Sequence, residues 1–319
     1  MVLGVERALL PELVVGADVL WRLTTDLLDT RPFVIDETGV KRLARAEDYV
    51  VFRNRFGGQD IDGDGDQDVP FLPDGSPWSA NFYGYRPGIS SAGGSLLTNG
   101  DSEVEYLGGS LTFTKRLSNR WMARGYLSYG DAELDFGSED RAFANPTDDP
   151  SGADGSAERP GGDLFVIQSA GSGPFENTFI QSTWSANLNG MYQVAPDRPW
   201  GFNLAGNVFA REGYPLLYSW DEVDPRGAAT TPVGTVVATA TRGVDDFRSD
   251  DIVTLDLRLE KDMRFSDNLS GILSLDSFNV TNETYIMGRE VSLDSLSANH
   301  VTQTLSPRIY RLGFRLNWR

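Results

Sequence analysis

Apolar and polar residues alternate along several long segments of the chain, the pattern of β-strands that present one apolar and one polar face. In residues 252–261, aliphatic side chains alternate with Thr, Asp, Arg and Glu, and residues 310–318 repeat the pattern with Tyr, Leu, Phe, Leu and Trp on one face. We therefore predict nine strands, near residues 2–9, 12–24, 102–117, 119–132, 178–194, 198–212, 250–264, 268–280 and 304–318.

Most of these segments run for roughly 11 to 17 residues, against about 5 or 6 in a typical globular strand. A strand that crosses a bilayer at a tilt needs about 9 to 11 residues. Aromatic residues lie mostly toward the ends of the predicted strands, where the interfacial girdles of a membrane barrel would lie: Trp21, Trp121, Trp184, Tyr192, Trp200, Tyr310 and Trp318. Length and aromatic placement both favour a membrane barrel.

The predicted connections alternate between short and long. Short turns lie near residues 10–11, 117–119, 196–197 and 266–268, and long ones cover 25–101, 133–177, 214–249 and 281–303. Short periplasmic turns that alternate with long extracellular loops are typical of outer-membrane barrels. The first long loop has room for an extra hairpin, from residues 49–53 and 81–85, and residues 144–155 are rich in Asp, Gly and Pro, a composition typical of disorder.

The predicted fold class is all-β, an antiparallel transmembrane β-barrel with about nine or ten long strands in residues 1–319. Bacterial single-chain barrels have even strand numbers. Because nine strands are found and the first begins at once, we expect the chain to be the C-terminal portion of a larger barrel. The first residues lack the basic segment, apolar core and cleavage site of a signal peptide.

Composition and charge narrow the function classes. Glycine (34 residues), proline (16) and 11% aromatics disfavour a helix bundle. The net charge of −18 repels phosphate, which argues against nucleic acid as a partner. With no cysteine, disulfides, thiolate metal sites and thiol nucleophiles are excluded, and no run of 18 apolar residues predicts a membrane-spanning helix.

Several segments resemble the end of TonB-dependent receptors, particularly the Oar-like group. The resemblance is carried by residues 254–262, Leu273 to Asn282, Ser306 to Trp318, and the hairpin of residues 111–125. It covers the strands and not the loops. Each motif is weak alone, and their order and C-terminal position make the combination specific.

This resemblance implies an outer-membrane receptor or transporter whose barrel is filled by an N-terminal plug and driven by TonB. The plug and the TonB box are absent from residues 1–319, so we expect energised uptake only in combination with an upstream part. The C-terminal segment resembles the signal read by the barrel-assembly machinery, carried here by Tyr310, Gly313, Phe314, Leu316 and Trp318. In such barrels the aromatic residue is usually the last, whereas here Arg319 follows Trp318.

The sharpest local motif is acidic. Five carboxylates alternate with other residues in a glycine-rich loop, the spacing at which a chain wraps a hard cation: Asp60, Asp62, Asp64, Asp66 and Asp68. The motif resembles the calcium loops of dockerins and thrombospondin type-3 repeats. Phe71 stands where an EF-hand has its bidentate glutamate, which excludes an EF-hand. A calcium site and a solvated acidic turn both remain open.

No residue is nominated as catalytic, and we expect no enzyme. His300 is the only histidine, which excludes a His-His zinc site, and we expect it in a surface loop. The acidic pairs 245–246 and 250–251 could serve a glycosidase, although loop solubility explains them equally well. No Gly-rich strand-to-helix phosphate loop is found.

Charged residues on the polar faces of the strands fit a water-filled interior lined by paired charges. The predicted members are Arg124, Arg211, Arg258, Arg311, Arg315, Asp18, Asp256, Glu260 and Asp276. The sequence thus predicts a barrel segment in the cell outer membrane with lipid as its neighbour and an unidentified extracellular ligand. A calcium-stabilised surface adhesion module and a small passive porin are the alternatives.

Overall fold

A computed structural model describes the chain except for residues 27, 100–102, 136–181, 224–234, 242–245 and 319. The described residues form antiparallel sheets and contain no α-helix; their one helical element is the 3-10 turn η1 (Ala46–Asp48). No described helix is long and apolar enough to cross a membrane. The predicted all-β class and antiparallel pairing are confirmed.

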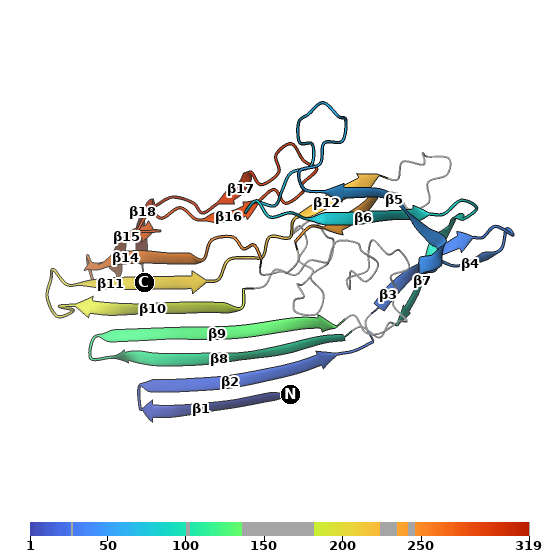
Figure 1. Cartoon of the computed structure of the whole chain (residues 1–319). Coiled ribbons are helices and arrows are strands. Elements are labelled where there is room, and N and C mark those ends of the chain that lie inside the picture. Colours follow the sequence, from blue (N-terminus) through green and yellow to red (C-terminus); the bar gives the residue numbers. More distant parts are fainter. Residues whose placement is uncertain (27, 100–102, 136–181, 224–234, 242–245, 319) are drawn as a thin grey trace.

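Nine long strands form the main sheet, and every neighbouring pair in it is antiparallel. In sheet order they are β1 (Val2–Leu10), β2 (Leu13–Thr24), β8 (Glu103–Ser118), β9 (Trp121–Asp135), β10 (Trp184–Val194), β11 (Phe202–Arg211), β14 (Ile252–Arg264), β15 (Leu269–Phe278) and β18 (Ile309–Trp318). The sheet follows chain order once the intervening connections are skipped (Figure 1). It is a continuous meander interrupted by insertions.

The nine predicted segments correspond one to one with these nine strands. The last was predicted to begin at residue 304 and begins at Ile309, because β17 (Val301–Thr304) pairs instead with β16 (Ile286–Arg289). The first residues of the fifth predicted strand, 178–181, lie outside the described residues.

The tight hairpins lie at one end of the main sheet (Figure 1). Between β8 and β9, Asn119 and Arg120 have φ values of 50° and 71°, the conformation of a two-residue type I′ turn. That turn matches the right-handed twist of the strands and sets Ser118 opposite Trp121. A bulge between Lys115 and Ser118 then shifts the register, which runs unchanged from Lys115 opposite Ala123 to Glu103 opposite Asp135.

The long connections lie at the other end and carry further strands (Figure 1). The pairing of β5 (Tyr49–Phe56) with β6 (Ser79–Tyr85) confirms the hairpin predicted within the first loop. The other short strands lie in segments predicted as plain loops: β3 (Leu28–Ile35), β4 (Lys41–Leu43), β7 (Ser90–Asn99), β12 (Ser219–Val223), β13 (Thr235–Thr239), β16 and β17. The predicted Asp-rich loop at 144–155 lies outside the described residues.

Three of these connections share one hydrophobic core, here called the loop core. Its buried residues come from the β5–β6 connection, the β12–β13 hairpin and the segment before β17: Val69, Leu72, Trp78, Ala80, Phe82, Tyr218, Trp220, Ala238, Ala240 and Leu293. The rings of Trp78 and Trp220 lie 6.0 Å apart. Connections far apart in the sequence therefore hold one another in place.

A buried carboxylate joins two of these connections. Glu222 on β12 accepts hydrogen bonds from the guanidinium groups of Arg53 and Arg55 on β5, at 3.0 and 3.1 Å for Arg55, and from the indole of Trp220 at 3.0 Å. The side chains of Glu222 and Arg55 are 6% and 9% exposed. Each charge is thus paired where water cannot screen it.

The main sheet is open. Among the described strands it begins at β1 and ends at β18, and neither pairs with a further strand, so no closed barrel is observed and the transmembrane barrel stays a prediction. Nine consecutive antiparallel strands leave β1 and β18 running in the same direction. The two edges therefore cannot pair with each other antiparallel.

Candidate functional site

One face of the main sheet is apolar across its whole width. Residues paired across neighbouring strands share a face: Leu188 lies opposite Gly125 and Val208, and Val208 lies opposite Leu255. We call this the apolar face; its exposed large members include Val19, Trp21, Leu23, Leu107, Leu111, Trp121, Leu127, Tyr129, Leu188, Tyr192, Leu204, Val208, Val253, Leu257, Leu259, Leu273, Leu275, Tyr310, Leu312, Phe314, Leu316 and Trp318.

These side chains lie in register on neighbouring strands, and no other part of the described chain covers them. Leu188 at the centre of the sheet is 48% exposed, and Leu312 on the edge strand is 74% exposed. Among the described residues, Ile252 is the one hydrophobic residue of the main sheet in the buried core, and the rest of that core lies in the connections. The apolar face is therefore an outer surface of the described part of the chain.

Aromatic residues lie toward both ends of the apolar face on three of its nine strands, and we call these two sets the aromatic rows. Three strands each carry an aromatic pair eight positions apart, and the row members also meet across strands, with Trp121 opposite Tyr192 and Tyr129 opposite Trp184. The pairs are Trp121 and Tyr129, Trp184 and Tyr192, and Tyr310 and Trp318. Eight residues of about 3.4 Å span roughly 27 Å along the strand, and about 20 Å across a bilayer at a tilt of about 40°.

The opposite face of the sheet is polar and hydrogen-bonded. On the central strands, Arg124 Nε donates to Asn189 at 2.8 Å, Asn189 donates to Asn187 at 2.8 Å, and Asn187 donates to Asn207 at 2.9 Å. This chain of bonds crosses β9, β10 and β11. We call this surface the polar face.

Charged residues pair on the polar face of β14, β15 and β18. Asp276, whose side chain is 6% exposed, lies 3.3 Å from Arg258 and 2.9 Å from Arg311, and Arg258 also lies 2.6 Å from Glu260. The sequence predicted these four residues as paired charges on one face, and the structure brings them together.

The other predicted members of the charged lining have different partners. Asp18 accepts from Ser110, Arg124 binds Asn189, and Asp256 accepts the backbone N–H of Asn279 at 2.9 Å. Arg211 is buried, with its guanidinium 3.7 Å from the ring centroid of Tyr214. Arg315 also lies on the polar face, by its register opposite Ile272. The predicted charged residues do share the polar face. Among them, ion pairs form only in the cluster on β14, β15 and β18.

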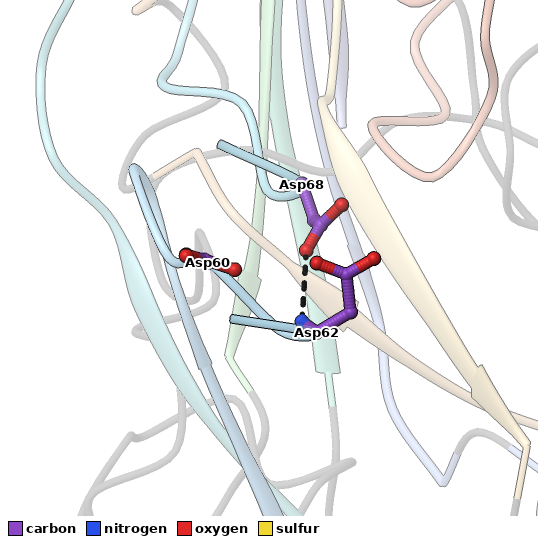
Figure 2. A group of neighbouring side chains, drawn as sticks. All are labelled: Asp60, Asp62 and Asp68. Atoms are coloured by element: carbon purple, nitrogen blue, oxygen red, sulfur yellow. Dashed lines mark hydrogen bonds between the residues drawn. The ribbon is translucent and has the colours of Figure 1, made fainter. Parts of the chain in front are cut away.

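The acidic loop brings together three of its five predicted carboxylates. One oxygen each of Asp60, Asp62 and Asp68 lies within 4.8 Å of the others, and Figure 2 shows Asp62 and Asp68 side by side. Asp64 and Asp66 are not part of this group. All three grouped residues are exposed.

Backbone hydrogen bonds give the acidic loop its shape. Asp60 accepts from the N–H groups of Gly63 and Gly65 at 2.7 and 3.0 Å, and Asp68 accepts from those of Ile61 and Asp62 at 2.6 and 3.3 Å. Gly63 and Gly65 have φ values of 80° and 97°, a conformation that favours glycine. These hydrogen bonds hold the carboxylates in the turn, and their oxygen-only donor set suits a hard cation, so calcium binding stays a prediction.

The predicted assembly signal lies on the edge strand β18. Tyr310, Phe314, Leu316 and Trp318 point to the apolar face, while Gly313 lies on the polar face opposite Ser274. A Cβ at Gly313 would meet the Ser274 hydroxyl at 2.7 Å, so a side chain at this position would require that hydroxyl to move. Recognition of this segment stays a prediction. His300 lies exposed between β16 and β17, as expected.

The comparisons with known proteins give no family. No family model matches this chain, and no curated protein matches it. The features that point to a function are therefore the two faces of the main sheet and the body that the connections build at one end of it.

Proposed function

We propose that the main sheet forms part of the wall of an outer-membrane β-barrel, with the apolar face against lipid and the polar face toward a water-filled interior. The observation that carries this proposal is the apolar face itself, a continuous exposed surface with aromatic residues toward both ends of three of its strands. A contiguous apolar patch larger than a few hundred Å² marks an interaction surface. Lipid-facing residues that alternate with interior residues are the pattern of transmembrane barrels.

The dimensions support a membrane as the partner. The aromatic rows are separated by roughly 20 to 27 Å, depending on tilt, and the apolar band of outer-membrane barrels is about 25 Å tall. Trp and Tyr prefer the membrane interface because one end of the ring is apolar and the other polar. A soluble partner sheet would not require its contacts to end in aromatic rows on both sides.

In this proposal further strands pair with both edges of the sheet to close the wall. Because β1 and β18 run in the same direction, antiparallel closure takes an odd number of additional strands. Nine plus an odd number is even, the parity of bacterial single-chain barrels.

The connections between the long strands support a role as a receptor. Tight hairpins at one end and a body with its own core at the other match the periplasmic turns and extracellular loops of outer-membrane proteins. Together with the resemblance of the strand segments to TonB-dependent receptors, this supports a receptor or transporter whose ligand meets the loop body first. The plug, TonB and the barrel-assembly machinery are the partners that this proposal implies.

The alternatives account for less of the structure. A calcium-stabilised adhesion module would use the acidic loop but leaves the exposed apolar face unexplained. A passive porin shares the wall and the polar interior. The loop core favours a receptor over a porin, because it builds a rigid body where an open pore mouth would need space.

Tryptophan fluorescence tests the proposal. Trp21, Trp121, Trp184, Trp200 and Trp318 lie in or near the aromatic rows, and the remaining Trp78 and Trp220 lie in the loop core. In vesicles of brominated lipid, we expect bromines near the headgroup end of the acyl chains to quench more emission than bromines at the chain ends. Emission equal to that in unbrominated vesicles would contradict the proposal.

A further inference from the structure

Three basic residues lie on the apolar face, all near its tight-turn end. Their register places them there: Arg7 on β1, Lys115 on β8 and Lys261 on β14. Each stands three positions before the last residue of its strand, and each of these strands runs into a tight hairpin (Figure 1). A charge on a lipid-facing surface is costly at the bilayer midplane and much less so near the interface. Positive charge is thus confined to one edge of the apolar face.

Acidic residues on the apolar face lie at the opposite edge. Glu105 on β8 lies opposite Leu23, and Asp131 on β9 lies opposite Leu107. Of the described residues that are paired into the apolar face at the tight-turn end, none is acidic. The two edges of this face therefore carry charges of opposite sign.

Strand β8 carries a charge at each edge. Glu105 and Lys115 are ten positions apart, and the residues between them on the apolar face are uncharged, at positions 107, 109, 111 and 113. Ten residues of about 3.4 Å span roughly 34 Å along the strand, and about 26 Å across a bilayer at a tilt of about 40°. The apolar band of outer-membrane barrels is about 25 Å tall. With the apolar face against lipid, these two charges lie at opposite headgroup layers.

The amines of both lysines are held at the level of the turns. Lys115 donates to backbone oxygens of its own hairpin, including that of Trp121 at 3.2 Å, and lies 4.2 Å from the centroid of the Trp121 ring. Lys261 reaches the neighbouring turn, where it donates to the backbone oxygen of Gly201 at 2.5 Å. Lysine stems can lie along an apolar surface while the amine stays in a polar layer. These contacts direct both amines out of the apolar band.

The three cations lack acidic partners. Among the described residues, no carboxylate forms an ion pair with Arg7, Lys115 or Lys261. Backbone oxygens carry no net charge, so the positive charges remain uncompensated. Arg7 is exposed and Lys261 partly exposed, whereas Lys115 is buried. Arg7 and Lys261 are therefore accessible to a ligand, and Lys115 adds its charge beside the same layer.

We propose that Arg7, Lys115 and Lys261 bind anionic phospholipid headgroups in the leaflet at the tight-turn end of the sheet. A zwitterionic headgroup carries its own cation beside the phosphate, whereas an anionic headgroup leaves its charge for a basic residue of the protein to pair with. The carboxylates at the other edge repel the same headgroup. This inference rests on the proposed function, because it requires the apolar face to contact lipid.

Brominated lipids test this preference on the full folded chain. Vesicles contain phosphatidylcholine and phosphatidylglycerol, and one of the two lipids carries bromines near the headgroup end of its acyl chains. Trp121, Trp200 and Trp318 lie at the tight-turn end and report on the lipid there. We expect quenching to give an association constant about two- to fivefold higher for phosphatidylglycerol, since one basic residue near an anionic leaflet favours it by about fivefold and tryptophans elsewhere dilute the difference. The net charge of −18 acts against this preference.

The triple change Arg7→Gln, Lys115→Gln and Lys261→Gln should bring the ratio of the two association constants to about one. Loss of Lys115 also changes the surroundings of the Trp121 ring, but the ratio compares two lipids in the same variant and cancels that effect. Arg7 is exposed, so Arg7→Gln remains informative if the triple variant does not fold, and it should lower the ratio in part.

The matched control is the triple change Arg22→Gln, Arg124→Gln and Arg315→Gln. It removes the same number of positive charges from the polar face and should leave the ratio unchanged. Equal quenching by the two lipids in the unchanged chain would overturn the inference, as would a preference that both triple variants lose or both keep. Quenching by neither lipid would instead contradict the proposed function itself.

Discussion

An arginine in place of Leu188 should lower the free energy of unfolding in lipid vesicles by about 2–4 kcal/mol, the cost of arginine at the bilayer midplane of a membrane barrel. Leu188 lies midway between Trp184 and Tyr192 on β10 and is 48% exposed. In the proposed orientation its side chain contacts acyl chains. Equilibrium unfolding by guanidinium in vesicles measures the change.

The matched control is Asn187→Arg, one residue away on the polar face. Asn187 donates to Asn207 at 2.9 Å, so this change removes about 1 kcal/mol of hydrogen bonding but keeps the new charge in water. The two variants differ in which face carries the charge. Equal losses of stability would contradict a lipid-facing apolar face.

Replacing Glu222 by alanine should destabilise the packing of β12 against β5, because Glu222 is the acceptor for Arg53 and Arg55. The change leaves Arg55 buried and unpaired, for which the cost is about 3–5 kcal/mol. We expect hydrogen exchange in β5 and β12 to accelerate roughly 100- to 5,000-fold while the main sheet keeps its protection. Exchange followed by mass spectrometry resolves the two regions.

Glu47→Ala is the control for this effect. Glu47 lies 3.3 Å from Arg45, and both side chains are about two-thirds exposed, so the pair is worth about 0–1 kcal/mol at most. Exchange in β5 should then stay near that of the unchanged chain. If Glu222→Ala has no larger effect than Glu47→Ala, the connections are not held together through Glu222.

The main sheet could be predicted from the sequence because its determinants are local. Alternation such as that from Val253 to Leu259 depends only on neighbouring residues, and it fixes the strand and the face of each side chain. The tight turns are local as well, as at Asn119 and Arg120. Pairing followed because consecutive strands lie side by side in a meander.

The body formed by the connections could not be predicted in the same way. Glu222 binds Arg55 across 167 residues, and no local pattern links the two. Short strands such as β12 and β4 have too few residues for a clear alternation. Of these elements, only the β5–β6 hairpin has enough aromatic and aliphatic residues to be recognised. The one sequence feature that points to a buried acidic partner for it is the pair Arg53 and Arg55 on β5.

The acidic loop shows the limit of motif spacing. Five aspartates at alternating positions predicted one ligand set, but the chain gathers three of them and turns their oxygens toward its own N–H groups.

The central claim is that the apolar face contacts lipid and the polar face contacts water. The chain has no cysteine, so single cysteines can be placed at the neighbouring positions Leu127 and Ser128 of β9, which point to opposite faces. In folded chain in vesicles, a water-soluble maleimide should label Ser128→Cys and spare Leu127→Cys, while both react after unfolding. Labelling of Leu127→Cys as fast as Ser128→Cys in the folded state would contradict the account.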